Sequence, residues 1–522
     1  MSAPILPLPI GVASFAQELS PVPFWGRVSF HSAGRLNRIR EDFQAVDSSA
    51  ARRTSPWNRT PRRRKKNGRI TERYYHISGA FSKPFFPPER TLPDDAKSRN
   101  SMKFFLTAEP YVGLRNAPCA RIFHYFPPEW NAVPQTSTYC PAMLSYCTNI
   151  HPAESWAETR EALQTHVPRI RQELAALNSP LKDRPLGIGL RLSARAAAEL
   201  LETPHAVEAL KSWLDEHDAR VETLNGFPYG NFHGQRVKEH VFQPDWTTPE
   251  RFEYTCNLFR ILARIGDENA DRLTVSTLPA SHSWFHAEEE RMFSRLDAMS
   301  GFLDVLSRQT GRLMQLGLEP EPFGHFHDTE GAIRFFNGLR NHSRRPELIE
   351  RHLGLTYDTC HFAILREEPA DTLSAWEENN ISLCKVQFSN ALECRIRGEE
   401  DLERLRQFDD GVYFHQTSIL HRGRTMLFPD LPNALAYGRD YAEETRDSQW
   451  RIHYHIPLYA SPEPPLRGTE DFILKTHAFL RSHPGLNPHL EVETYTWSVL
   501  PDHLKIPLAA QIARELHYVE TL

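Results

Sequence analysis

The chain has 522 residues, of which 40% are hydrophobic and 24% charged, a composition that suits a protein with a large folded core. Its formal net charge of −5 gives no general attraction to nucleic acid or to an anionic membrane, because both need a positive field. The seven cysteines include no Cys-x-x-Cys pair, which favours a reducing compartment. No apolar run reaches the ~20 residues that span a bilayer, and the first residues lack the basic start of a secretory signal. We therefore expect a cytoplasmic protein without a membrane span and without a nucleic-acid partner.

Residues 1–140 differ from the rest of the chain in composition and in hydrophobic patterning. Prolines are scattered through them, and the run Arg52–Lys66 is strongly basic and has no apolar periodicity. We interpret this region as a Pro/Arg-rich extension that is largely disordered and whose basic run is a solvated tail. A second interpretation is that it precedes the native start, because Met143 stands directly before the first well-formed strand.

From residue 143 onward, short apolar runs alternate with amphipathic helical patterns such as Glu161–Leu177 and Arg251–Ile265. This alternation is typical of βα units around a parallel sheet. Eight such units predict an α/β fold, a (β/α)₈ TIM barrel enlarged by insertions and spanning residues 143–522. The predicted strands are Leu144–Asn149, Leu186–Leu192, Arg220–Leu224, Leu273–Leu278, Leu316–Glu319, Leu355–Asp358, Leu383–Phe388 and Leu490–Tyr495.

An insertion is expected around residues 395–459, between the seventh and eighth runs. It contains one further strand-like stretch, Trp450–Tyr459. That stretch is either the true seventh or eighth strand of the barrel or a part of a subdomain, and the sequence leaves both open.

The loop after the third run carries polar and aromatic side chains where the mouth of the barrel is expected. Catalytic groups of such a barrel come from the carboxyl ends of its strands and the loops that follow. The third run continues into Asn225, Phe227 and Tyr229 and then into His233, with glycines between them. Turn residues with aromatics and a histidine are typical of a loop that closes over a small polar ligand. For Phe227 and Tyr229 the alternative, a loop whose glycines only serve its turns, is equally open.

Carboxylates and histidines end the later runs. The fifth run ends in Glu319, the sixth in Asp358 with His361 three residues on, and the eighth carries Glu493, while the extra stretch adds His455. Each alone has an ordinary explanation as a solvated loop residue, a helix cap or a surface histidine, so the inference depends on their joint position. Together they form a mixed oxygen and nitrogen ligand set that suits Mn²⁺, Mg²⁺, Co²⁺ or Zn²⁺.

The motifs LEPEP, DTCH and LEVET, in this order, resemble the metal-site signature of the xylose-isomerase-like sugar isomerase, epimerase and apurinic-endonuclease barrels. A closer resemblance, to the metabolite-traffic protein EboE family within that superfamily, is carried by MLSYCTNIHPAESW, TLNGFPYGNFHGQRVKEHVFQPDW, LGLEPEP, YDTCHFA and HLEVETYTW. It covers the chain from Met143 to its last residue.

The resemblance implies roles for the strand-end residues. Glu319, Asp358 and Glu493 would be metal ligands, and His361 would lie beside the substrate and act in catalysis. The superfamily usually places a histidine on the seventh strand, where this chain has Gln387. The fourth ligand is then either His455, if its stretch returns to the barrel, or the amide oxygen of Gln387. We expect His455, with Gln387 contacting the substrate.

Three functions remain open at this point. The first is a metal-dependent isomerase- or epimerase-like enzyme for a small hydroxylated or carbonyl metabolite, with Glu319 and Glu493 as candidates for proton transfer. The second is a barrel that binds a metabolite and hands it to proteins of the same pathway without turnover. The third is an apurinic endonuclease, which the acidic balance of the chain opposes.

Overall fold

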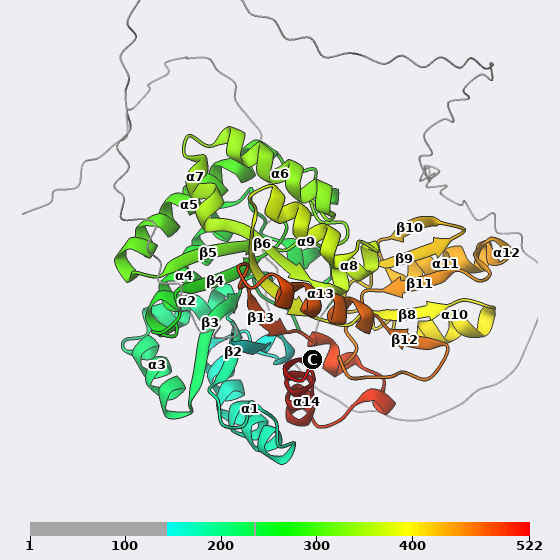
Figure 1. Cartoon of the computed structure of the whole chain (residues 1–522), viewed down its shortest axis with the longest axis horizontal. Helices are drawn as coiled ribbons and strands as arrows, with labels where there is room; N and C mark the ends of the chain where they lie inside the picture. The colour runs from blue at the N-terminus through cyan, green and yellow to red at the C-terminus, as the bar shows by residue number, and fades with distance from the viewer. Residues whose placement is uncertain (1–142, 234–235) are drawn as a thin grey trace, which may run out of the picture. The chain divides into compact units, whose positions relative to one another are not determined.

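The computed structural model describes residues 143–233 and 236–522, so the predicted extension 1–140 lies outside the described residues. The predicted barrel is confirmed: eight parallel strands close in the order β1-β13-β7-β6-β5-β4-β3-β2, with helices around them (Figure 1). The strands are β1 (Leu144–Cys147), β2 (Leu186–Arg191), β3 (Ala219–Asn225), β4 (Arg272–Thr277), β5 (Leu313–Leu318), β6 (Leu353–Asp358), β7 (Ser382–Phe388) and β13 (His489–Val492).

Each barrel strand overlaps a predicted run, but the ends differ. The strand β1 stops before Asn149, because Thr148–Ile150 turns into a short 3₁₀ helix. The last strand stops at Val492, so that Glu493 stands just beyond the ladder, although its backbone N–H still donates to the Phe388 carbonyl at 3.0 Å. Both shortened ends bring polar side chains to the mouth of the barrel.

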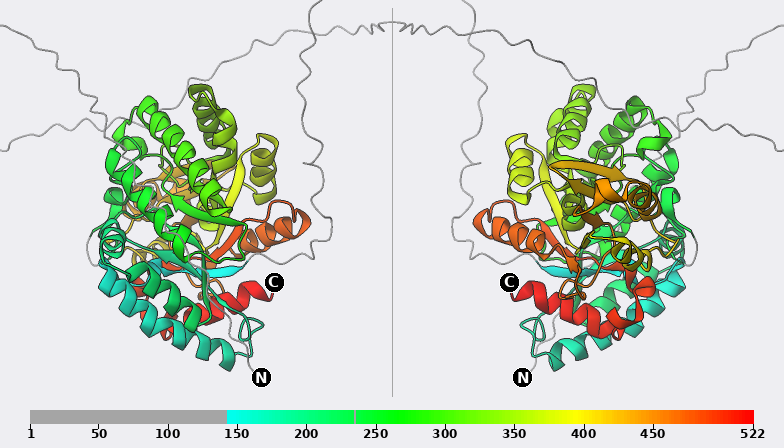
Figure 2. Two further views of the ribbon diagram at one scale, coloured as in Figure 1. Left: turned by 90° about the vertical axis from the view of Figure 1, so that its left-hand side faces the viewer. Right: turned by 90° about the vertical axis from the view of Figure 1, so that its right-hand side faces the viewer.

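The outer helices begin at the capping signals that the sequence carries. Ser155 and Glu158 form a reciprocal capping box at the start of α1, and Thr248 caps α4, whose first residue is Pro249. Figure 2 shows α1 and α14 side by side, where they pack on each other. These helices are α1 (Trp156–Ala176), α2 (Ala194–Glu202), α3 (Ala206–Glu216), α4 (Pro249–Ile265), α5 (Glu289–Thr310), α6 (Thr329–His342), α7 (Pro346–His352), α8 (Thr359–Leu365), α9 (Pro369–Glu378), α13 (Glu470–Ser482) and α14 (Leu508–Glu520).

Between β7 and β13 the chain builds a second, antiparallel sheet of five strands in the order β10-β9-β11-β8-β12, drawn in yellow and orange in Figure 1. It has its own core around Trp450 and Tyr454. Its elements are β8 (Leu392–Arg395), α10 (Glu399–Arg406), β9 (Thr417–His421), β10 (Arg424–Phe428), α11 (Leu431–Asp440), α12 (Ala442–Thr445), β11 (Gln449–Ile452) and β12 (Leu466–Gly468).

The extra stretch Trp450–Tyr459 is not a barrel strand. Its first residues belong to β11 of the second sheet, and the residues after Ile452 leave that sheet. They return to the barrel mouth, where the backbone N–H of Ile456 donates to the Asn390 carbonyl at 3.0 Å. Within the described ranges, no helix combines the length and the apolar character needed to cross a membrane.

Candidate functional site

Three carboxylates from three barrel strands converge at the mouth of the barrel. Glu319 follows β5, Asp358 ends β6 and Glu493 follows β13, and each offers an oxygen within 4.8 Å of the other two. All three side chains are buried, and Asp358 is 0% exposed. Three negative groups held this closely away from water repel one another strongly unless protons or cations bind between them.

Asp358 has one oxygen fully engaged and one oxygen left open. Its Oδ1 caps α8 by accepting from the backbone N–H groups of Cys360 at 2.7 Å and His361 at 3.2 Å, and it also accepts from the Ser389 hydroxyl at 2.5 Å. Its Oδ2 has no hydrogen-bond partner, and neither has Oε2 of Glu319. Buried carboxylate oxygens without partners are rare, and a bound cation is one way to satisfy them.

Glu493 is held by side-chain amides from β3, from β7 and from the 3₁₀ helix that follows β1. Its Oε1 accepts from Asn149 at 2.8 Å and from Asn225 at 3.3 Å, and its Oε2 accepts from the Gln387 amide at 2.6 Å. The Cys147 thiol adds a contact at 3.4 Å. Since the Gln387 N–H group faces Glu493, the Gln387 side chain acts here as a donor that orients a carboxylate.

Three histidines face the same space, and two of them come from the returning segment after β11. His453 and His455 bring their Nε2 atoms to 3.2 Å of each other. His455 also lies with Asp358 and His361 in a group whose ligand atoms are within 4.8 Å, and His361 and His453 form a similar group with Glu321. The structure therefore brings His455 to Asp358, beside the group that Glu319 and Glu493 complete.

The hydrogen bonds of these histidines fix which nitrogen carries the proton. Nδ1 of His361 faces the Pro320 carbonyl at 2.9 Å and Nδ1 of His455 faces the Glu493 carbonyl at 2.9 Å, so both Nδ1 atoms are donors. Their Nε2 atoms are left with lone pairs, the arrangement in which imidazole binds a metal.

The tautomer of His453 follows from its amide neighbour. Gln416 donates from its Nε2 to Glu321 at 2.9 Å and to the Pro322 carbonyl at 3.2 Å, which turns its oxygen toward Nδ1 of His453 at 2.6 Å. His453 is thus a donor at Nδ1, and its Nε2 lone pair faces that of His455. The Tyr495 hydroxyl lies 3.4 Å from the same Nε2 atom.

The electrostatics of the site favour neutral groups. Burial, with Glu493 and Asp358 nearby, raises the pKa of Glu319 well above its ordinary value, and burial with Asp358 raises the pKa of Glu493 in the same way. Burial lowers the pKa of His455 to about 4 and also lowers that of His453. A bound divalent cation would instead lower the pKa of these carboxylates, because it stabilises their charged form.

The buried lysine Lys385 only partly offsets the rise in the pKa of Glu319 and Glu493, and it is paired with another carboxylate. Lys385 on β7 lies 3.2 Å from Glu491 and 3.1 Å from the Ser276 hydroxyl, and both charged side chains are 0% exposed. Within the described ranges no lysine or arginine forms an ion pair with any of four buried acidic residues of the site: Glu319, Glu321, Asp358 and Glu493. Their oxygen atoms and the imidazole nitrogens form a donor set that fits divalent ions such as Mn²⁺, Co²⁺ and Zn²⁺.

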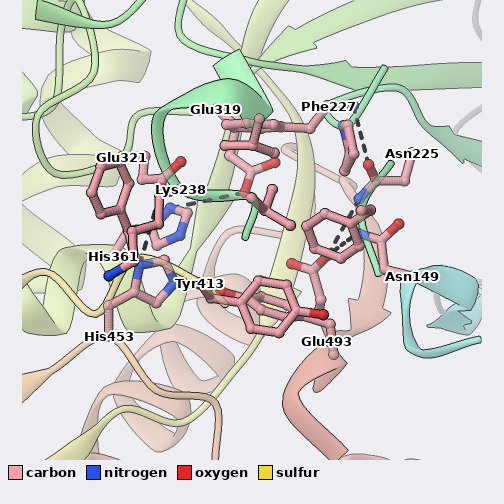
Figure 3. A pocket seen from close by; sticks show the side chains of 16 residues that line it. Asn149, Asn225, Phe227, Lys238, Glu319, Glu321, His361, Tyr413, His453 and Glu493 are labelled. Atoms are coloured by element: carbon pink, nitrogen blue, oxygen red, sulfur yellow. Dashed lines mark hydrogen bonds and ion pairs between the residues drawn. The ribbon is translucent and has the colours of Figure 1, made fainter. Parts of the chain in front are cut away.

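A cavity of about 530 Å³, counted with its open mouth, is lined by Glu319, Glu321 and Glu493 (Figure 3). Of the predicted ligand-contacting residues, Asn225 and Phe227 line it, whereas Gln387 lies below Glu493. Tyr229 packs against Tyr254 with ring centroids 5.1 Å apart. His233 faces the Asn149 carbonyl at 2.7 Å and the Tyr413 hydroxyl at 3.1 Å. These two side chains support the walls and do not line the cavity.

Sequence reasoning missed several residues that line or support the cavity. Tyr413, Phe414 and Gln416 come from the insertion, and Lys238 comes from the 3₁₀ helix Lys238–Phe242 after β3. Lys238 forms a buried ion pair with Asp430, the N-cap residue of α11, and this pair joins the 3₁₀ helix to the insertion. Among the missed residues the sequence gives little signal, because an aromatic pair before a strand has many ordinary explanations.

Solved structures similar to this one include xylose-isomerase-like barrels. The IOLI protein with a binding zinc atom shows 12% identity and a TM-score of 0.36, with coverage of 73% of this chain and 96% of that chain. A xylose isomerase domain protein from Alicyclobacillus acidocaldarius shows 13% identity and a TM-score of 0.35, with coverage of 73% of this chain and 100% of that chain. The 3-keto-D-glucoside 4-epimerase YcjR from E. coli shows 12% identity and a TM-score of 0.29, with coverage of 48% of this chain and 79% of that chain. At these values the likeness says nothing about what this chain binds, and the fold class stands on the order of its own strands.

No protein-family model matches the chain, and no curated protein does.

Proposed function

We propose that this protein is a barrel of the sugar isomerase and epimerase type that binds a divalent metal and acts on a small hydroxylated or carbonyl metabolite. The observation that carries the proposal is the convergence of Glu319, Asp358 and Glu493, with Oε2 of Glu319 and Oδ2 of Asp358 buried and without partners. Buried acceptors that lie close together beside a cavity are what a chelated cation and its ligand require.

A metal held there would polarise a carbonyl group and its neighbouring hydroxyl. It would so favour removal of a proton from the carbon that carries the hydroxyl. The residues of this chain would do the rest. Asn149 and Asn225 line the cavity and hold Glu493 in place. Glu319 and Glu493 both line the cavity and are the candidates to exchange a proton with the ligand.

His361 and His455 have separate places in this proposal. His361 lines the cavity, with its Nδ1 proton directed at the Pro320 carbonyl, so it would contact the ligand through Nε2. His455 would complete the ligand set from the side of Asp358. Gln387, which donates to Glu493, would orient that ligand and would not bind the metal itself.

The resemblance of the motifs to the EboE family supports a finer proposal, in which the metabolite is handed on to proteins of the same pathway. The two forms of the proposal differ in turnover. Removal of a proton from carbon leads to exchange with solvent deuterium, whereas binding and transfer alone leave the carbon–hydrogen bonds intact.

The test is metal analysis of the purified full chain by mass spectrometry, followed by proton NMR of hydroxyacetone in deuterated buffer with Mn²⁺ removed or replaced by Mg²⁺ or Zn²⁺. We expect at least one divalent ion per chain and exchange of the hydrogens on the hydroxyl-bearing carbon next to the carbonyl. Glu319→Gln should abolish exchange, whereas Glu330→Gln, at a side chain 88% exposed, should leave it unchanged. Protein that binds no divalent metal would refute the proposal, and metal binding without exchange of any carbonyl probe would favour transfer over catalysis.

A further inference from the structure

The cavity has a polar floor and apolar walls. The floor consists of residues at strand ends, because parallel strands present their carboxyl ends at one edge of the barrel. The walls come from the loop after β3 and from the insertion, and they carry mainly carbon atoms. The wall residues are Phe227, Phe232, Val237, Val241, Tyr413 and Phe414.

Three rings of the walls form a continuous aromatic cluster. Phe232 lies 5.3 Å from Tyr413 and 5.4 Å from Tyr495, measured between ring centroids, and the two tyrosines are 5.1 Å apart. The geometries are tilted or edge-to-face, as expected for aromatic side chains that pack without a partner ligand between them. A flat ring of a ligand would find both ring faces and ring edges here.

The polar atoms of the Tyr413 and Lys238 side chains, which line the cavity, already have partners. The Tyr413 hydroxyl is bonded to His233 at 3.1 Å, and the Lys238 ammonium is paired with Asp430. Hydroxyl groups of a free sugar placed against these walls would therefore lose water without gaining partners, at a cost of about 1–3 kcal/mol for each buried group. The walls select against a ligand that is polar along its whole length.

The aromatic surface continues from the cavity to the exterior. Phe414 lines the cavity and meets Trp284 edge to face, with centroids 5.8 Å apart, and Trp284 is 47% exposed. Phe323 lies next to Trp284 at 6.4 Å and has a left-handed backbone with φ of 67°. Its carbonyl accepts from the Ser283 backbone at 3.0 Å, which ties the two loops together. A bulky residue in this conformation stores strain, and such strain gathers at ligand sites.

We propose that the ligand is an amphiphile with a hydroxy-carbonyl head and an aromatic substituent. The head lies on the carboxylate floor, and the ring lies in the cavity against Phe232, Tyr413 and Phe414, with Trp284 covering its outer end. The position of the head rests on the proposed function, whereas the position of the ring rests on the walls alone.

The test compares ligands that share one head. Binding of hydroxyacetone and of 1-hydroxy-3-phenylpropan-2-one to the full chain with Mn²⁺ is measured by isothermal titration calorimetry, with D-fructose as the polar reference. We expect the phenyl compound to bind ~10- to 100-fold more tightly than hydroxyacetone, from the apolar area of one ring. Fructose binding more tightly than the phenyl compound would overturn the proposal.

Variants then locate the ring. Trp284→Ala should weaken binding of the phenyl compound by roughly 3- to 10-fold, and should affect hydroxyacetone less, because a ring contact is lost at the outer end. Leu474→Ala removes another exposed apolar side chain, at 45% exposure on α13, and should change neither affinity. Thermal melting checks that both variants fold. If Trp284→Ala and Leu474→Ala bind the phenyl compound with the same affinity, the ring does not contact Trp284, and the proposal is overturned.

The two proposals fail in different ways. If the protein binds no metal but still prefers the phenyl compound over hydroxyacetone, the proposed function fails and the aromatic walls keep their role. If Mn²⁺ binds and the phenyl group brings no gain in affinity, the walls do not select a ring and the proposed function stands.

Discussion

Replacing Lys385 by methionine should destabilise the protein strongly. The Lys385 ammonium and the Glu491 carboxylate lie 3.2 Å apart and are both 0% exposed, so removing the cation leaves a buried anion. The anion has little room to move, because its second oxygen lies where a Cβ of Gly189 would stand. Loss of one partner from such a pair costs about 3–5 kcal/mol of unfolding free energy.

Urea unfolding followed by circular dichroism measures this loss. The double variant with Lys385→Met and Glu491→Leu removes both charges and should regain most of the stability, to within ~1 kcal/mol of the unmodified chain. Lys475→Met is the matched control, since its ammonium pairs with Glu368 at 46% and 53% exposure, and the change should stay within about 0.5 kcal/mol. A single variant that loses less than ~1 kcal/mol, or a double variant that sums two large losses, would refute the reasoning.

Three further predictions concern the cation, a buried acid and a glycine. Mn²⁺ at about 100 times its dissociation constant should add ~2.7 kcal/mol of stability in urea, and Glu319→Gln should abolish that gain. Burial raises the pKa of Glu515 from 4.5 to about 7, so the folded chain holds the proton more tightly. The stability that this bound proton gives the folded chain is fully present below pH 4.5. It is lost as the pH rises through 7, which lowers the unfolding free energy by up to ~3 kcal/mol. Comparison of pH 5 with pH 8 should show a smaller decline for Glu515→Gln. Gly189→Ala should cost about 1–3 kcal/mol in the same urea assay, because the methyl group overlaps the Glu491 carboxylate; an unchanged midpoint would contradict the close approach.

The barrel could be predicted because its strands are buried on both faces. Such strands have continuous apolar runs, and β2 and β6 are buried at every residue. The carboxylates at Glu319 and Asp358 were visible for a related reason, since a charge that directly follows an apolar run stands at a strand end. A continuous apolar run is a local property of the sequence, and the barrel repeats it eight times.

Pairing between distant segments could not be predicted in the same way. The stretch Trp450–Tyr459 has the pattern of one strand, yet its first residues pair with β8 and β9 and the rest returns to the barrel mouth. Nothing local distinguishes the two halves. The walls of the cavity could not be predicted for the same reason, because Phe232 contacts Tyr413 only after the insertion has folded against the loop that follows β3.

This division has a consequence for how the site works. The groups suited to chemistry, Glu319, Asp358 and Glu493, are fixed by barrel strands whose ladder hydrogen bonds leave them little freedom. The groups proposed to select a ligand lie on two segments outside the barrel ladder, which are joined by the backbone hydrogen bond from Val237 to the Val412 carbonyl at 2.8 Å and by the buried pair of Lys238 and Asp430. If the protein binds a ligand as proposed, changes in the insertion would alter which molecule is bound while leaving the carboxylate floor intact. His453 and His455 are the exception, because they stand on the insertion and reach the floor, and they would couple the choice of ligand to the geometry around Asp358.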